Sequence, residues 1–416
     1  MIKELIKMMN LFLNVWRKKK TEKQSEKITE CPHEVQAHAG VSRLTEQVTS
    51  FLQGNYDFRF NLLTEETEFR SLNNMKQGFM PIGKRELNTI CMEAHTEGIS
   101  CWDKDISRYI FSTRIGEYHP FRLYMDELPV WDGIDRVISL ARRVSELPLW
   151  VSGFHTWLLG LAAQWAGQTQ IHANSVAPLL VSSEQGKLKS TFCKSLMPES
   201  LRRYYLDNFK LTSEGQAERL MAEMGLINLD EFDKYPSAKM PILKNLMQMS
   251  GLTVCKAYQR NFRSLPRIAS FIGTSNRFDL LNDPTGSRRF LCVKVEKTID
   301  CDGIDHSQLF AQLKEELRRG VAYWFSHEAE CAWQRNNSVF YKSNPVEDVF
   351  YSCFRLPQAG EGYERLSAAE IFKELKGRNA AALRAFNPSL LAQTLLKLGV
   401  IRRHTEYGNV YEVVRR

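Results

Sequence analysis

The sequence lacks any pair of cysteines spaced C-x-x-C, although it contains nine cysteines. They are scattered through the chain, at positions 31, 91, 101, 193, 255, 292, 301, 331 and 353. An odd number of cysteines without paired spacing argues against both a zinc site and a disulfide framework. It favours a reducing compartment, and we expect the protein to be cytoplasmic.

The sequence also lacks an apolar run long enough to span a bilayer. Residues 1–20, MIKELIKMMNLFLNVWRKKK, place a short apolar stretch between basic flanks, without the cleavage site of a signal peptide. We interpret this stretch as a frayed leader, or as a sign that translation starts at Met8 or Met9. A peripheral membrane helix is the alternative. We therefore expect no stable membrane insertion.

Charge of one sign is not in large excess. The 416 residues are 43% hydrophobic and 25% charged, and the formal net charge is +8. These values are typical of a globular protein with two or three domains. The net charge permits a polyanionic partner such as nucleic acid but does not require one.

Patterning divides the chain into four parts. Residues 1–40 are a leader and a polar linker, and 41–145 form a small mixed α/β domain. In that domain YDFRFNLLTEETEFRSL predicts a strand pair, and RELNTICMEAHTEG predicts a helix that ends at a glycine. Residues 146–345 contain an apolar helix and four short apolar runs, VAPLLVSS, MGLINLDEFD, RIASFIGTSN and RRFLCVKV. Runs that are apolar on both faces predict strands of a helix-covered sheet, hence an α/β core.

The last part, residues 346–416, reads as helix, helix and hairpin, which is the arrangement of a winged helix. Ser367 and Glu370 form a capping box at the first helix. Pro388 and Gly399 bracket the second helix. Gly408-Asn409 predicts the hairpin turn. A packing module that binds no DNA is the alternative, because basic residues are few here.

A loop of unusual composition follows the first apolar run of the core. The stretch SSEQGKLKST has the spacing of a phosphate-binding loop, G-x-x-x-x-G-K-[ST], but Ser183 and Leu188 stand where glycines are expected. The loop precedes a predicted helix, as phosphate binding requires. The cofactors predicted here are ATP and Mg²⁺. Lys189 would reach the β- and γ-phosphates, and Ser190 would bind Mg²⁺. The remaining contacts would come from Gln185, Gly186 and Thr191.

Two acidic residues end the next strand, in GLINLDEFD. Asp230 would hold Mg²⁺, directly or through water, and Glu231 would polarise the attacking water, because phosphoryl transfer needs a metal and an oriented nucleophile. An exposed, solvated pair of acids is the alternative. A metal-dependent nuclease using Asp230, Glu231 and Asp233 is a third reading, which lacks the dispersed carboxylates of a two-metal site.

Two further segments complete the set. Asn276, at the polar tip of FIGTSN, would contact the γ-phosphate or the water. Arg288 and Arg289, in DPTGSRRF, would neutralise transition-state charge from across a subunit boundary. We expect one of the two arginines to act there and the other to pair with an acid.

The segment LTVCKAYQRNFRSLPR is basic, contains aromatic residues and has no acid. Cations follow a phosphate backbone and aromatic rings stack on bases, so this pattern suits single-stranded DNA. The residues are Lys256, Tyr258, Arg260, Phe262, Arg263 and Arg267. A solvated hairpin without ligand is the alternative.

The order of loop, LDEFD, basic hairpin, GTSN and GSRRF resembles the virulence-associated E (VirE/VapE-like) family of P-loop ATPases, which is similar to superfamily 3 helicases. LPVWDGIDRV and FHTWLLGLAAQW resemble the segments that precede the loop in that family. The resemblance covers residues 120–345.

The resemblance implies an α/β P-loop NTPase core, AAA+-like, that assembles into a homo-oligomer, usually a hexameric ring. ATP would bind at subunit junctions and single-stranded DNA in the channel. A primase is a candidate partner, and replication or mobilisation of a phage or mobile element is the implied task. By position, Lys189 and Ser190 fall on the nucleotide motif, and Asp230 and Glu231 on the acid pair.

The same resemblance places the sensor at Asn276, the finger at Arg288 or Arg289, and the strand-tracking hairpin at Lys256 and Arg260. The chain departs from the family at Leu188, whose side chain would crowd the approach of phosphate to the backbone. We therefore expect an ATP-dependent DNA helicase or translocase. The alternative is a catalytically weak nucleotide- or DNA-binding module.

Overall fold

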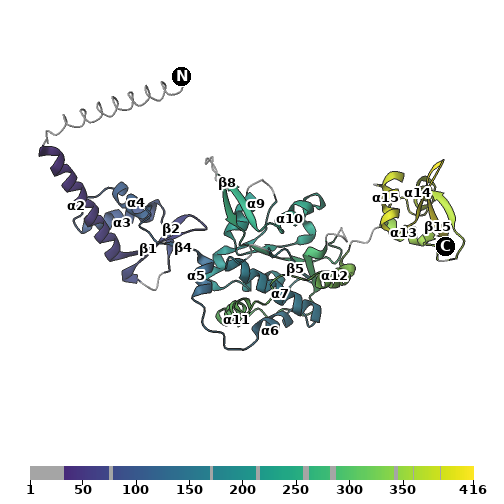
Figure 1. The fold of residues 1–416 in the computed structure, drawn as a ribbon, viewed down its shortest axis with the longest axis horizontal. Helices are drawn as coiled ribbons and strands as arrows, with labels where there is room; N and C mark the ends of the chain where they lie inside the picture. Colours follow the sequence, from purple (N-terminus) through teal and green to yellow (C-terminus); the bar gives the residue numbers. More distant parts are fainter. Residues whose placement is uncertain are drawn as a thin grey trace, which may run out of the picture. The chain divides into compact units, whose positions relative to one another are not determined.

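The computed structural model describes residues 32–74, 78–168, 172–211, 216–255, 262–281, 287–341, 345–358, 360–384 and 386–416 (Figure 1). The chain forms two compact units, Met1–Pro120 and Phe121–Arg416. Residues 121–145, which the sequence patterning placed in the N-terminal domain, belong to the second unit. No described helix is both long enough and apolar enough to cross a membrane.

The first unit packs three helices on a small sheet of order β3-β2-β1-β4. The helices are α2 (Pro32–Asn55), α3 (Lys84–Thr96) and α4 (Asp103–Ile110), and a 3-10 turn η1 spans Leu72–Asn74. The strands are β1 (Tyr56–Asn61), β2 (Glu66–Ser71), β3 (Met80–Pro81) and β4 (Glu117–Tyr118). The predicted strand pair is β1 with β2, antiparallel from Tyr56↔Ser71 to Asn61↔Glu66. The predicted helix is α3.

Helix α2 begins at Pro32, inside the segment that the sequence patterning assigned to a linker. The described core contacts of this helix come from its C-terminal half, through Val48, Phe51 and Leu52. Polar residues dominate its first half, so that apolar periodicity gave no signal there. The predicted leader at 1–20 and the first part of the predicted linker, up to residue 31, lie outside the described residues.

The second unit is built on a sheet of five parallel strands in the order β11-β5-β10-β7-β6. They are β5 (Ala177–Val181), β6 (Tyr205–Asp207), β7 (Leu226–Leu229), β10 (Ser270–Ser275) and β11 (Phe290–Lys294). The four predicted runs form β5, β7, β10 and β11, which confirms a helix-covered parallel sheet. Strand β6 was not predicted, because three residues at a sheet edge are too short for a periodic signal.

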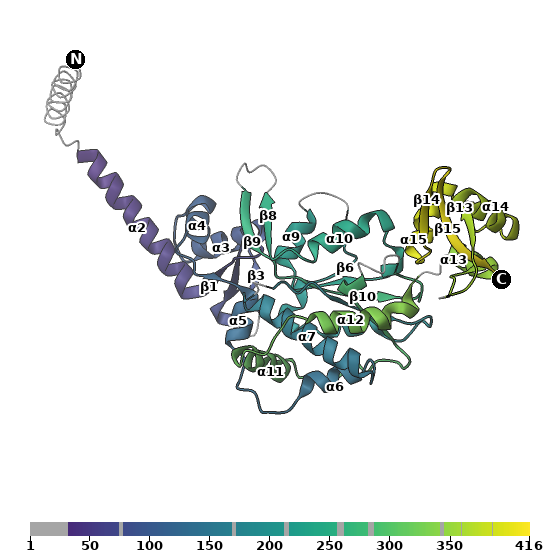
Figure 2. The same cartoon turned by 45° about the vertical axis from the view of Figure 1, so that its right-hand side comes forward.

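Helices cover both faces of this sheet (Figure 2). Helix α7 lies across one face, where Trp157 donates to the carbonyl of Phe271 at 3.0 Å, and α9 and α10 lie on the other. The helices are α5 (Pro120–Asp126), α6 (Arg136–Arg142), α7 (Pro148–Trp165), α8 (Lys189–Ser195), α9 (Gln216–Glu223), α10 (Met240–Leu246), α11 (His306–Arg318) and α12 (His327–Asn336). Short 3-10 turns are η2 (Glu199–Tyr204), η3 (Phe232–Lys234), η4 (Ser237–Lys239), η5 (Ser287–Arg289) and η6 (Asn337–Phe340).

A separate hairpin joins β8 (Gly251–Cys255) to β9 (Phe262–Pro266).

The C-terminal segment has its own core. It contains α13 (Pro345–Cys353), β12 (Phe354–Arg355), β13 (Glu364–Ser367), α14 (Ala368–Arg378), α15 (Pro388–Lys397), β14 (Arg402–Thr405) and β15 (Gly408–Arg415). Ser367 and Glu370 form the predicted capping box. The hairpin turn differs from the prediction. Thr405 pairs with Gly408, so the turn consists of residues 406–407 and Gly408 begins the second strand.

Candidate functional site

Three parallel strands end at one edge of the five-stranded sheet, and the chemistry-bearing residues follow those ends. The loop 182–188 follows β5, Asp230 follows β7, and Asn276 follows β10, which lies between the other two strands. In open parallel sheets the crevice outside the carboxyl ends of the strands is where ligands bind. The topology therefore brings the predicted loop, acid and amide together.

The loop between β5 and α8 contains two residues in the left-handed backbone region. Gly186 has φ 80°, and Leu188, immediately before α8, has φ 58° and ψ 27°. A side chain in this region costs roughly 1–2 kcal/mol. Leu188 therefore adopts a backbone that favours the glycine it replaces, and its side chain is exposed. Gln185 and Thr191 are also exposed, in the loop and in the first turn of α8.

A segment after β11 braces this loop. The Lys187 ammonium donates to the carbonyl of Glu296 at 2.9 Å and pairs with Glu184 at 2.8 Å. The backbone N–H of Ile299 donates to the carbonyl of Lys187 at 3.2 Å. The Ser182 hydroxyl accepts from the backbone N–H of Glu184 at 3.1 Å. The sequence reasoning did not identify this brace, since residues 296–299 carry no motif.

Lys189 is a buried cation at the start of α8, with 7% of its surface exposed. Its ammonium donates to Asn276 Oδ1 at 2.9 Å and to the carbonyl of Ser182 at 3.4 Å. Burial lowers the pKa of Lys189, and the neighbouring charge of Asp230 acts in the opposite direction. An ammonium has three donors. The two hydrogen bonds with described residues leave one donor for an anion.

Asp230 accepts two hydroxyl hydrogen bonds on one oxygen. Ser190 Oγ donates to Asp230 Oδ1 at 2.8 Å, and Thr274 Oγ1 donates to the same oxygen at 2.5 Å. The structure thus joins α8, β7 and β10 through a single carboxylate. Sequence reasoning missed Thr274, although it lies two residues before Asn276 in GTSN.

Glu231 and Asp233 take different partners. Glu231 has φ 50°, its backbone N–H donates to Thr274 Oγ1 at 3.4 Å, and its carboxylate pairs with Lys234 at 2.6 Å. Asp233 accepts from Ser275 Oγ at 2.8 Å. The Glu231–Lys234 pair is exposed, and exposed pairs contribute little, so the Glu231 carboxylate can exchange Lys234 for water.

Arg288 and Arg289 lie at the amino-terminal ends of the parallel strands, opposite to the ends that the loop follows. They immediately precede β11, whose first residue Phe290 pairs with Ala177, whereas the loop follows Val181 at the other end of β5. The four residue steps from Ala177 to Val181 correspond to roughly 13 Å along the strand. Arg288 lies 3.7 Å from Glu330. The structure therefore does not bring either arginine to the loop of its own chain.

The segment predicted to bind DNA forms an antiparallel hairpin, β8 with β9. Lys256, Tyr258 and Arg260 lie outside the described residues. Arg263 lies in β9, and its side chain is also outside the described part. Phe262 pairs with Cys255 at the start of β9.

Arg267 is not available to DNA, contrary to the prediction. Its guanidinium is 1% exposed and donates to the carbonyls of Ala269 at 2.8 Å, Asn174 at 2.8 Å and Met249 at 3.3 Å, and to that of Met247. Burial lowers its pKa to about 9. The side chain ties the base of the hairpin to the core. Sequence patterning counted it as a surface cation because it adjoins the basic run.

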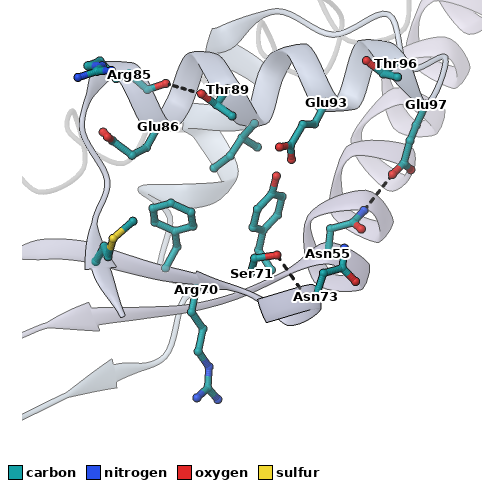
Figure 3. Close-up of a pocket in the computed structure, with 14 residues that line it drawn as sticks. Asn55, Arg70, Ser71, Asn73, Arg85, Glu86, Thr89, Glu93, Thr96 and Glu97 are labelled. Carbon is teal, nitrogen blue, oxygen red and sulfur yellow. Dashed lines mark hydrogen bonds between the residues drawn. The ribbon is translucent and has the colours of Figure 1, made fainter. Parts of the chain in front are cut away.

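A cavity of 660 Å³ lies in the first unit, and none of the predicted site residues lines it (Figure 3). Glu86, Glu93 and Glu97 reach it from α3, and Glu97 accepts from Asn55 at 3.2 Å. The guanidinium of Arg70 points away from the helix, and pairs with Asp57 at 2.7 Å. Arg85 lines the cavity as well, so its charged residues are three glutamates and two arginines, and no sequence motif indicated it.

Comparisons with known proteins place these residues in a family. The virulence-associated protein E-like domain matches residues 125–342, just over half of the chain. A domain of unknown function, DUF3874, matches residues 343–413. No curated protein matches the chain.

Among solved structures, two apo structures of the NrS-1 C-terminal region align with TM-scores of 0.46 and 0.45 at 10% sequence identity. Each alignment covers 90% of this chain and 99% of the other. The family assignment rests on the sequence match, which spans α6 to α12 and includes the loop, Asp230 and Asn276. The chain belongs to the virulence-associated protein E-like family.

Proposed function

We propose that the crevice at the ends of β5, β7 and β10 binds ATP with Mg²⁺ and hydrolyses it. The observation that carries the proposal is the grouping of a buried Lys189 ammonium with Asn276 beside a Ser190–Asp230–Thr274 cluster. A buried cation that makes hydrogen bonds to neutral oxygens fits an anionic ligand, because charge in a dry site is stabilised by an opposite charge.

Each residue has a role in the proposed reaction. Lys189 binds phosphate oxygens with the donor that its two hydrogen bonds leave. Asn276 Oδ1 accepts from Lys189, so in this proposal its amide NH₂ group is the donor to the γ-phosphate or to the attacking water. Glu231 orients that water once Lys234 is released. Gln185, Gly186 and Thr191 contribute the surrounding contacts of the phosphate-binding loop.

Ser190 and Asp230 supply the oxygen ligands that Mg²⁺ prefers. Their hydrogen bond holds the two side chains together, and Thr274 fixes the orientation of the carboxylate. When bound, Mg²⁺ neutralises the charge that develops on the phosphates. The residues present therefore fit the ion.

We further propose that the protein acts as a ring, with Arg288 of one subunit reaching the nucleotide of the next. The roughly 13 Å between the ends of β5 supports this arrangement, because the chain's own arginines lie at the far edge of the sheet from its loop. Arg288 is the better placed of the two. Its side chain is 47% exposed and its pair with Glu330 is long.

The proposed ring moves on single-stranded DNA. The hairpin residues that contact the DNA in this proposal are Lys256, Tyr258, Arg260 and Arg263. The C-terminal helices α14 and α15 and the β14–β15 hairpin form a winged-helix-like module in this proposal. The task is replication or mobilisation of a phage or mobile element, with a primase as candidate partner. The family membership supports it.

The test is ATP hydrolysis by the purified full chain with and without single-stranded DNA. Stimulation by DNA is expected, and Glu231→Gln is expected to stop turnover while ATP binding persists. Lys189→Ala sets the baseline. Turnover that stays no higher than that of Lys189→Ala even with single-stranded DNA present would refute the hydrolase and leave a nucleotide- or DNA-binding module.

A further inference from the structure

Three side chains of the kinds that bind metal ions lie close together in the first unit, far in sequence from the residues of the proposed nucleotide site. Cys91 and His95 lie one turn apart on α3, and Cys101 lies just before α4. The two Sγ atoms and a ring nitrogen of His95 all lie within 4.8 Å of one another. Gly98, with φ 81°, turns the chain back after α3 and brings Cys101 to the other two.

We propose that Cys91, His95 and Cys101 form a zinc site that joins the end of α3 to the start of α4. Tetrahedral zinc with bonds of about 2.3 Å to sulfur and about 2.0 Å to nitrogen places neighbouring ligand atoms roughly 3.5 Å apart. Cys91 Sγ and His95 Nε2 are 3.9 Å apart. No two of the three ligand atoms are more than 4.8 Å apart, so closing the site needs shifts of about an ångström at most.

The chemistry of the set selects zinc over the harder ions. Two sulfurs and an imidazole are soft donors, whereas Mg²⁺ and Ca²⁺ take oxygen ligands. His95 Nε2 faces the carbonyl oxygen of Cys101 at 2.6 Å. Binding metal replaces that hydrogen bond and fixes the tautomer with the proton on Nδ1. A solvent molecule takes the fourth position, because His95 is exposed.

Burial supports a structural cross-link. Cys101 is 3% exposed and Cys91 9%. Because zinc binds the thiolate, binding releases protons, and the free energy of binding adds to the stability of the first unit.

The chain contains a matched control. Cys331 and His327 lie one turn apart on α12, with Sγ and Nε2 3.6 Å apart. They repeat the helical half of the site, and no third ligand accompanies them among the described residues. A two-ligand pair binds metal much more weakly. Cys331→Ser therefore reports on non-specific thiol binding.

The experiment titrates the reduced full chain with Co²⁺, as a spectroscopic probe, and then displaces it with Zn²⁺. We expect one equivalent with a thiolate-to-cobalt charge-transfer band. Cys91→Ser and Cys101→Ser should each lose the band, and His95→Gln should weaken binding at least tenfold. Cys331→Ser and Lys189→Ala should bind like the wild-type protein, so that the outcome is independent of the nucleotide site.

Stability gives a second readout that does not depend on the variants binding cobalt. A chelator should lower the thermal unfolding temperature of the zinc-loaded wild type and leave that of Cys101→Ser unchanged. The proposal is overturned if the reduced wild type binds no cobalt or zinc, or if Cys101→Ser binds as the wild type does. A Cys91–Cys101 disulfide in freshly isolated, alkylated protein would also overturn it.

Discussion

The ammonium of Lys189 donates a 2.9 Å hydrogen bond to Asn276 Oδ1, across 87 residues of sequence. The bond connects the start of α8 to the end of β10, and it leaves the amide NH₂ group of Asn276 as a donor for the proposed phosphate. A lysine held this way is preorganised, because its side chain is already ordered before the anion binds. The proposed anion site thus combines two residues, neither of which indicates a site by itself.

Removing the Lys189 charge should weaken ATP binding. A hydrogen bond to a charged group contributes about 1.5–3 kcal/mol, so Lys189→Ala should raise the Kd for ATP roughly tenfold to a hundredfold. Calorimetric titration measures this. Lys194, exposed at the end of α8, provides the control, and Lys194→Ala should bind as the wild type. Equal loss in both variants would show a general charge effect and contradict the site.

Replacing Leu188 by glycine should stabilise the protein. Leu188 has φ 58°, a backbone conformation that glycine adopts without steric cost, so the substitution should raise the free energy of unfolding by about 1 kcal/mol. ATP affinity should also rise, since a side chain no longer stands beside the phosphates. Denaturant unfolding and ATP titration test the two effects. Leu188→Ala shortens the side chain but keeps Cβ, so a gain in stability with alanine equal to that with glycine would argue against backbone strain.

Much of the second unit could be predicted because its strands are fully buried. Leu226–Leu229 and Ser270–Ser275 are buried along their whole length, and such runs signal strands without any contact information. The Lys189, Asp230 and Asn276 positions followed from those strand ends. Arg267 could not be placed, because its four carbonyl partners come from segments that the sequence does not show to be adjacent.

The sequence did not indicate the grouping of Cys91, His95 and Cys101, for a related reason. C-x-x-C spacing is the usual sequence signal of a zinc site, whereas here one helical turn and the turn at Gly98 bring the three side chains together. The hairpin turn was misplaced by two residues, because Gly408 uses its positive φ to begin a strand and not to make the turn.

Shortening Arg267 should destabilise the second unit. Arg267→Met leaves buried carbonyls of Ala269, Asn174, Met247 and Met249 without their donor. Unsatisfied buried groups cost about 1–3 kcal/mol each, and partial relaxation should leave a net loss near 3 kcal/mol. Urea unfolding measures it. Arg202→Met, at an exposed arginine of η2, should change stability little, and a comparable loss there would contradict a particular role for Arg267.

The pair of His155 and Glu316 should make stability depend on pH. His155 Nε2 lies 2.6 Å from Glu316 Oε2, joining α7 to α11, and the hydrogen bond to Glu316 raises the pKa of His155. Since the folded pKa lies above the unfolded value of about 6.5, the stabilisation is complete below that value. It is lost as pH rises through the folded pKa.

Urea unfolding at a series of pH values from about 6 to 9 tests this. The wild type should lose stability over that window, and His155→Gln should flatten the dependence. Glu316→Gln keeps the imidazole but removes the charge that raises its pKa, so it should flatten the dependence too. An unchanged slope in both variants would assign the pH dependence to other groups.

Mixing two inactive variants should restore ATP hydrolysis if Arg288 acts across a subunit boundary. Lys189→Ala removes the nucleotide site and keeps the arginine, whereas Arg288→Ala does the reverse. In a mixed ring, some interfaces pair an intact nucleotide site with an intact arginine, and these should hydrolyse ATP. Arg289→Ala mixed with Lys189→Ala tests which of the two neighbouring arginines is used. Because the loop and Arg288 lie at opposite ends of β5 in one chain, recovery requires a second subunit. Full activity of Arg288→Ala by itself, or no recovery on mixing, would contradict the assignment.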